Sequence, residues 1–96
     1  MANEWQSWDA AEYIETTEDV VEFLNAVLEL GDPTLLPEAL GAVARSKGMT
    51  AIAKEAGVGR ESLYKSLTRK GNPRFSTIAK VLDVMGLEFQ VVVKHA

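Results

Sequence analysis

The sequence predicts an all-α fold, a small bundle of about five helices, followed by one C-terminal β strand. Apolar residues recur three and four positions apart through most of residues 16–86, which places them on single helix faces. From residue 87 to 93 the period becomes two, which is typical of a strand. A chain of 96 residues is long enough for one domain with a modest core. We therefore expect an N-terminal arm over residues 1–15 and one folded domain over residues 16–96.

The composition argues against an enzyme. The chain contains no cysteine and a single histidine, His95, in its C-terminal segment. It has no glycine-rich phosphate loop, since Gly57-Val58-Gly59 lacks both the length and the lysine. We therefore expect no catalytic site, no cofactor and no metal site. No apolar run is long enough to span a membrane, so the expected location is the cytoplasm, with no membrane partner.

The two parts of the chain carry opposite charge. The net charge is −4, but residues 1–32 contain nine acidic residues and no lysine or arginine. The remaining residues hold all ten basic side chains against five acids. This asymmetry indicates two surfaces with different partners, the acidic one facing a basic molecule. The alternative is an acidic helix face that is merely solvated.

Large aromatic side chains stand in the acidic arm. Tryptophan and tyrosine are enriched at the energetic centres of protein interfaces, so we expect this segment to dock on a partner. The alternative is that the arm folds back over the core of its own domain. The predicted partner surface combines these aromatics with two acids of the first helix: Trp5, Trp8, Tyr13, Glu18 and Glu22.

The first two helices have clear boundaries. Thr16 followed three residues later by Asp19 is a capping signal for a helix that ends at Gly31. A second helix is predicted from about Thr34 to Ser46, with Pro37 tolerated if it falls in the first turn. Thr50 is predicted to cap the helix that follows.

Residues 49–67 read as two short helices joined by a tight turn. Ile52, Ala53 and Ala56 form one apolar face, and Gly57 can leave the helix with a positive φ. Leu63 and Leu67, four residues apart, face inward from the second helix. This is the pattern of a helix-turn-helix, whose second helix lies in the DNA major groove. The alternative is an ordinary helical hairpin within a small bundle.

The basic side chains cluster on and after the second helix of this pair. Residues at its start and one turn later are predicted to read bases: Arg60, Glu61, Tyr64 and Lys65. A hydroxyl and the loop cations are predicted to contact phosphates: Ser62, Arg69, Lys70 and Arg74. The alternative is that this basic surface is only solvated.

The C-terminal part predicts a last helix and then the strand. Ser76 begins the helix, Gly86 ends it, and Phe75 is expected in the core. A lone strand over residues 87–93 cannot satisfy its backbone hydrogen bonds, so we expect it to pair across a homodimer through Phe89, Val91 and Val93. The alternative is an irregular coil across the chain's own core.

Several stretches resemble a known family. The run from Ala53 to Val58 looks like the helix-turn-helix of phage Cro and Xre-type repressors. The acidic DAAEY arm, Leu30-Gly31-Asp32-Pro33, ALGAVAR over residues 39–45, GVGRESLYK over 57–65 and GNPRF over 71–75 resemble the addiction-module antidote proteins, which are HigA-like antitoxins. The likeness covers about residues 8 to 93. Gly59 departs from the family pattern, because a serine commonly caps the recognition helix there.

The resemblance implies the antitoxin of a type II toxin–antitoxin module. Such proteins neutralise a small, basic RelE/HigB-like ribonuclease toxin, and as homodimers they bind double-stranded operator DNA and repress their own operon. Two other functions fit the sequence. One is a free-standing Xre-like transcriptional repressor without a toxin partner, and the other is a protein-interaction module that has lost DNA binding.

Overall fold

A computed structural model describes residues 14–94 of the chain. Within them the fold is all-helical, as predicted, and no residue is in a β strand. The helices are α2 (Thr17–Glu29), α3 (Leu35–Lys47), α4 (Met49–Ala56), α5 (Arg60–Ser66) and α6 (Phe75–Val84). None of these helices is long and apolar enough to cross a membrane.

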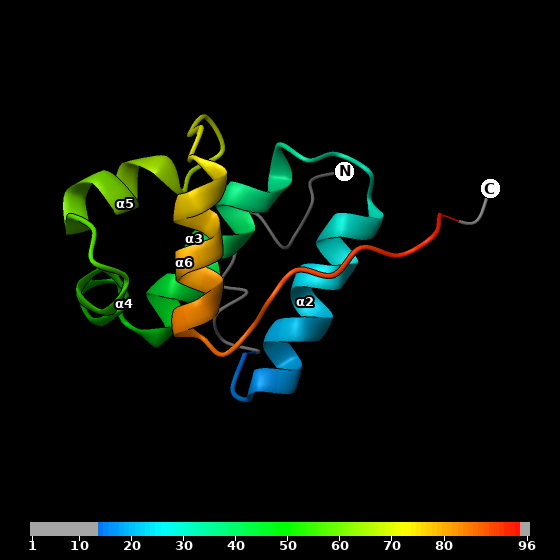
Figure 1. Cartoon of the computed structure of the whole chain (residues 1–96), viewed down its shortest axis with the longest axis horizontal. Helices are drawn as coiled ribbons and strands as arrows, with labels where there is room; N and C mark the ends of the chain where they lie inside the picture. The colour runs from blue at the N-terminus through cyan, green and yellow to red at the C-terminus, as the bar shows by residue number, and fades with distance from the viewer. Residues whose placement is uncertain (1–13, 95–96) are drawn as a thin grey trace.

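Helix α3 is the centre of the bundle. It packs against α2 on one side and α4 on another, while α4 also contacts α5 and α6 (Figure 1). Ala39, Leu40, Val43 and Ala44 of α3 are completely buried, and they join buried side chains from every other helix in one core. The arrangement leaves α5 at the opposite end of the molecule from α2 and the C-terminal segment (Figure 1).

Helix α2 begins with the predicted capping box. The backbone N–H of Asp19 donates to the Thr16 hydroxyl (3.1 Å), and the Asp19 carboxylate accepts from the backbone N–H of Thr16 (3.1 Å) and of Glu15 (3.0 Å). The Glu15 N–H, followed by the Thr16 N–H, lowers the pKa of Asp19 from its usual 3.8, because both stabilise the ionised carboxylate.

Helix α3 accommodates its proline as predicted. Pro37 is the third residue of the helix, where the missing N–H would have had no partner within the helix. The prediction that Thr50 caps the next helix is wrong. Thr50 lies inside α4, and Gly48 precedes the helix with a φ of 101°, a conformation that glycine adopts without strain.

The C-terminal region differs from the sequence prediction in two ways. Phe75 is the first residue of α6 and is 69% exposed, so it does not lie in the core. Instead its ring stacks on Phe89, with centroids 5.4 Å apart. The predicted strand over residues 87–93 is absent from the isolated chain.

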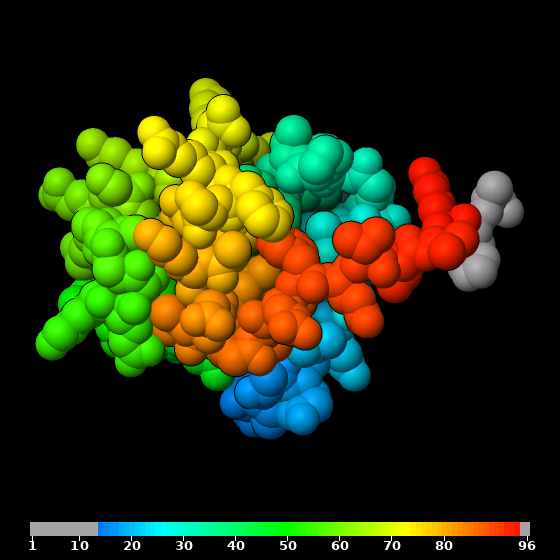
Figure 2. All heavy atoms as spheres, viewed as in Figure 1, coloured from blue at the N-terminus to red at the C-terminus, as the bar shows by residue number. Residues whose placement is uncertain are grey.

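Residues 87–94 instead form an irregular extended segment that crosses α2 and then leaves the body of the molecule (Figures 1 and 2). The physical reason is that a strand needs a neighbouring strand to bond its backbone, and the part of this chain that the structure describes offers none. Leu87 is the last residue of the segment whose N–H bonds to backbone, donating to the carbonyl of Leu82 at 2.8 Å.

Candidate nucleic-acid interface

Helices α4 and α5 are joined by the tight turn that the sequence predicts. Gly57 ends α4 with a φ of 73°, in the left-handed region that favours glycine. The N–H of Val58 then reaches back to the carbonyl of Ala53 (3.0 Å), which satisfies an acceptor at the end of the helix. Ala53 is buried, as expected of a small residue where the two helices approach closely.

Helix α5 has one anchored side and one open side. Leu63 and Leu67 are each 1% exposed and fix the helix to the core. The four predicted base-reading residues are all exposed: Arg60, Glu61, Tyr64 and Lys65. Glu61 and Lys65 lie on the side opposite Leu63, whereas Arg60 is exposed as the first residue of the helix. No ion pair joins Glu61 to a cation of residues 14–94, so the carboxylate and the neighbouring cations are available to a ligand.

Two glycines hold α5 in position. Gly41 of α3 lies so close to the Leu67 carbonyl that a Cβ at residue 41 would collide with it. Gly71 of the following loop lies against the Ser66 carbonyl, which also leaves no room for a Cβ. The loop therefore folds back onto the C-terminal end of α5, while α3 supports that end from the core.

The loop brings the predicted phosphate contacts next to α5. Arg69, Lys70 and Arg74 are exposed, as is Ser62 on α5 itself. The Thr68 hydroxyl donates to the Lys65 carbonyl (3.0 Å) and ties the start of the loop to the helix. Base-reading and phosphate-binding candidates thus share one continuous part of the chain, from residue 60 to residue 74.

An acid that the sequence analysis missed lies near this loop. The Thr34 hydroxyl (2.7 Å) and the Thr34 N–H (3.0 Å) both donate to the Asp32 carboxylate. They lower the pKa of Asp32, and the positive charge of Arg69 lowers it further. Asp32 follows α2 in the sequence, far from the loop, so no local pattern links it to Arg69.

The close packing of Gly41 on the end of α5 was also not predicted, although a glycine inside a helical pattern is itself a signal of close packing.

The predicted partner-binding residues fall into two groups. Trp5, Trp8 and Tyr13 lie outside the described residues. Glu18 and Glu22 are exposed and one turn apart on α2, so they share a helix face. The structure therefore separates the acidic face of α2, formed by Glu18 and Glu22, from the basic residues 60–74.

The predicted dimer residues Phe89, Val91 and Val93 are also exposed.

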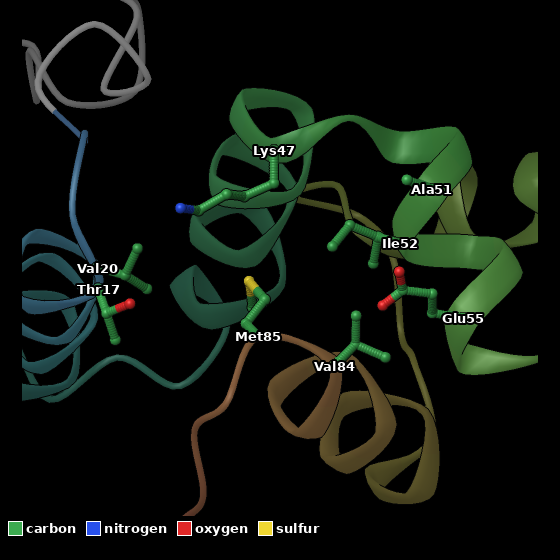
Figure 3. A pocket seen from close by; sticks show the side chains of 8 residues that line it. All are labelled: Thr17, Val20, Lys47, Ala51, Ile52, Glu55, Val84 and Met85. Atoms are coloured by element: carbon green, nitrogen blue, oxygen red, sulfur yellow. The ribbon is translucent and has the colours of Figure 1, made fainter.

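A small pocket lies apart from α5. Its volume is about 280 Å³, and Figure 3 shows side chains from α2, α4 and the ends of α3 and α6 around it. Val20, Ile52 and Val84 contribute apolar surface, and Lys47 and Glu55 are the ionisable side chains of the lining. None of the predicted DNA-contacting residues lines this pocket.

Comparisons with known proteins identify the family. Residues 4–93 match the family model described as "Probable addiction module antidote protein". The chain is also 40% identical over 91 residues to an uncharacterized protein of Haemophilus influenzae, a match that covers 95% of this chain and 94% of the relative. No solved structure matches the chain. The match covers nearly the whole sequence, and the chain therefore belongs to the family of probable addiction module antidote proteins.

Proposed function

We propose that this protein is an antitoxin that binds two partners through opposite ends of its fold. One partner is a small, basic RelE/HigB-like ribonuclease toxin, which the antitoxin neutralises. The other is double-stranded operator DNA, which it binds as a homodimer to repress its own operon. Family membership supports the antidote role, since an antidote implies a toxin. The DNA-binding role rests on the exposed basic surface of residues 60–74.

The observation that carries the DNA-binding proposal is the contrast on α5 between buried leucines and exposed polar side chains. Leu63 and Leu67 are fully packed, whereas Arg60, Glu61, Tyr64 and Lys65 are exposed and free of ion pairs within residues 14–94. In the proposed helix-turn-helix, α4 crosses the DNA backbone and α5 enters the major groove. Arg60 reads guanine through its bidentate fork, and Glu61 accepts a hydrogen bond from cytosine.

The toxin-binding proposal rests on charge. Every acid of α2 and of the turn that follows it is exposed or half-exposed, and residues 1–32 contain no basic side chain. A ribonuclease must attract the phosphates of RNA and therefore presents basic surface near its active site. An acidic partner surface complements that charge and speeds association. In this proposal Glu18 and Glu22 face the toxin together with Trp5, Trp8 and Tyr13 of the arm.

The DNA-binding proposal is tested by mobility shift on the DNA upstream of the gene, over a series of salt concentrations. If a dimer neutralises about eight phosphates, log affinity should fall with log salt at a slope of about −7. Lys65→Ala should weaken the complex, whereas Lys80→Ala, an exposed lysine of α6, is the matched control and should not. Equal effects of the two substitutions, or a slope near zero, would refute DNA binding through α5.

The toxin proposal is tested by co-expression. A small basic protein encoded beside this gene should arrest growth when expressed alone, and this chain should restore growth. Reversing two charges on α2, as Glu18→Lys with Glu22→Lys, should abolish rescue, while the same reversal at Glu55 and Glu61 should leave rescue intact. Rescue by the α2 variant would mean that the acidic face is only solvated.

A further inference from the structure

An open apolar groove runs between α2 and the C-terminal segment. Its volume is about 720 Å³. Helices α2, α3 and α6 supply one wall, and residues 87–90, 92 and 94 of the same chain supply the other. Val21 and Leu28 line the groove while remaining 39% and 44% exposed. An open hollow lined by exposed apolar side chains is a place where a partner can bury apolar surface.

Three valines near the end of the C-terminal segment carry much of its exposed apolar surface. Val91, Val92 and Val93 are 96%, 74% and 80% exposed, and Val92 also lines the groove. The end of this segment extends away from the helices (Figures 1 and 2). The backbone of residues 88–94 makes no backbone–backbone hydrogen bond within the described residues. Three consecutive valines with an unbonded backbone suit a strand that pairs with another chain.

The groove and the valines lie side by side on one surface. A surface that carries both an apolar hollow and exposed apolar side chains can pair with a second copy of itself, which is the requirement for a two-fold symmetric interface. We propose that the groove is filled by residues 91–93 of a second copy, and that the second copy's groove receives the same residues in return. The inference rests on the proposed homodimer and names the surface through which it forms.

This arrangement accounts for features that pairing of two strands alone leaves unexplained. Exchange of residues 91–93 between the two copies would bury the valines and would also cover the exposed faces of Val21 and Leu28. In addition it leaves Glu18 and Glu22 open, because neither lines the groove, whereas Glu29 at the other end of α2 does. At 100° per residue, Glu18 and Glu22 lie at the edge of α2 away from the core, beside the face that carries Val21 and Leu28. The dimer could therefore still meet a basic toxin.

The first test is the molar mass of the chain without DNA or toxin, measured by light scattering after size exclusion at about 10 µM, where a micromolar dimer is populated. The wild type should be a dimer. Leu28→Lys in the groove and Val91→Glu among the exposed valines should each raise the dissociation constant at least about a hundredfold, because each places charges in an apolar contact. Leu30→Lys is the matched control, since Leu30 is exposed but does not line the groove.

The second test is a mixture of the two monomeric variants. In a heterodimer of Leu28→Lys with Val91→Glu, one exchanged contact is wild type on both sides, and the other pairs a lysine with a glutamate. Exchange therefore predicts that mixing restores the dimer, seen as the 1:1 species in native mass spectrometry. Circular dichroism of each variant alone should show the wild-type helix content, because both positions are exposed in the single chain.

Three results would overturn the inference: a monomeric wild type, a dimer that either single variant leaves intact, or a mixture that stays monomeric. A monomer whose groove variants lose toxin binding would assign the groove to the toxin. The failure of this inference is distinct from failure of the proposed function. A chain that dimerises through the groove but gives no mobility shift retains the interface and loses only the DNA-binding role.

Discussion

The α4–α5 region and the C-terminal segment both carry clear secondary-structure patterns in the sequence, yet only the first forms the elements that its pattern predicts. Residues 49–66 form two helices whose backbone bonds close within the helices and whose side chains, such as Leu63, pack on α3. Residues 87–94 have the alternation of a strand but no strand beside them. The difference teaches that a helix closes its backbone hydrogen bonds within its own residues, whereas a strand pattern can describe an assembly rather than a chain.

The largest expected effect contrasts one aliphatic side chain from each region. Leu63→Ala should reduce the free energy of unfolding by about 2–5 kcal/mol, because it leaves a cavity in the core. Val91→Ala removes a side chain that is 96% exposed, and it should change the unfolding of the isolated chain by less than about 0.5 kcal/mol. Urea unfolding at low protein concentration measures both values. A comparable loss in the two variants would place residue 91 in the chain's own core.

A second prediction removes the support of α5. Gly41→Ala should destabilise the fold by about 1–3 kcal/mol, although alanine is the better helix former by about 1 kcal/mol, because the new methyl group collides with the Leu67 carbonyl. DNA affinity should fall as well, since α5 must shift. Thermal unfolding and mobility shift measure the two effects. An increase in stability would mean that α3 and α5 are not in close contact.

A third prediction concerns α2, the helix against which the C-terminal segment lies. The pKa of Asp19 is lowered from 3.8 in the folded chain. At a pH between the lowered pKa and 3.8, the unfolded chain therefore binds more protons than the folded chain. The stability contributed by the capping box is therefore present above pH 3.8 and is lost as the pH falls through the lowered pKa. Asp19→Asn should flatten this dependence in acid-unfolding curves, whereas Asp83→Asn, at an exposed position of α6, should not. Parallel curves for the wild type and Asp19→Asn would contradict this role.

The smallest expected effect sharpens the description of α5. Gly59 precedes this helix in an extended conformation and provides no side-chain cap, unlike Thr16 before α2. Gly59→Ser should stabilise the fold by a few tenths of a kcal/mol, because the hydroxyl can accept from an N–H of the first turn. Paired thermal unfolding curves should resolve the gain. A loss would show that residue 59 needs the freedom of glycine.

Much of the fold and site could be predicted because the decisive signals are local. Thr16 with Asp19, Pro37 in a first turn, and Gly57 at a helix end each depend on residues within a few positions. The exposure of Glu61 and Lys65 follows from the burial of Leu63, because each lies two residues from it and so on the opposite side of α5. The position of Phe75 could not be predicted, because its ring stacks on Phe89, a distant residue in an irregular segment. The proximity of Asp32 to Arg69 and of Gly41 to Leu67 likewise depends on tertiary packing.

The most direct test of the central claim, that α5 reads operator DNA, is a competition mobility shift with Arg60→Ala. The wild type should bind its upstream DNA in preference to a scrambled duplex of the same composition. Arg60→Ala should lose about 1–3 kcal/mol of that preference for each guanine contact and retain the weak binding to scrambled DNA. If Arg60→Ala binds both duplexes as the wild type does, α5 does not read the bases and its exposed cations are only a solvated surface.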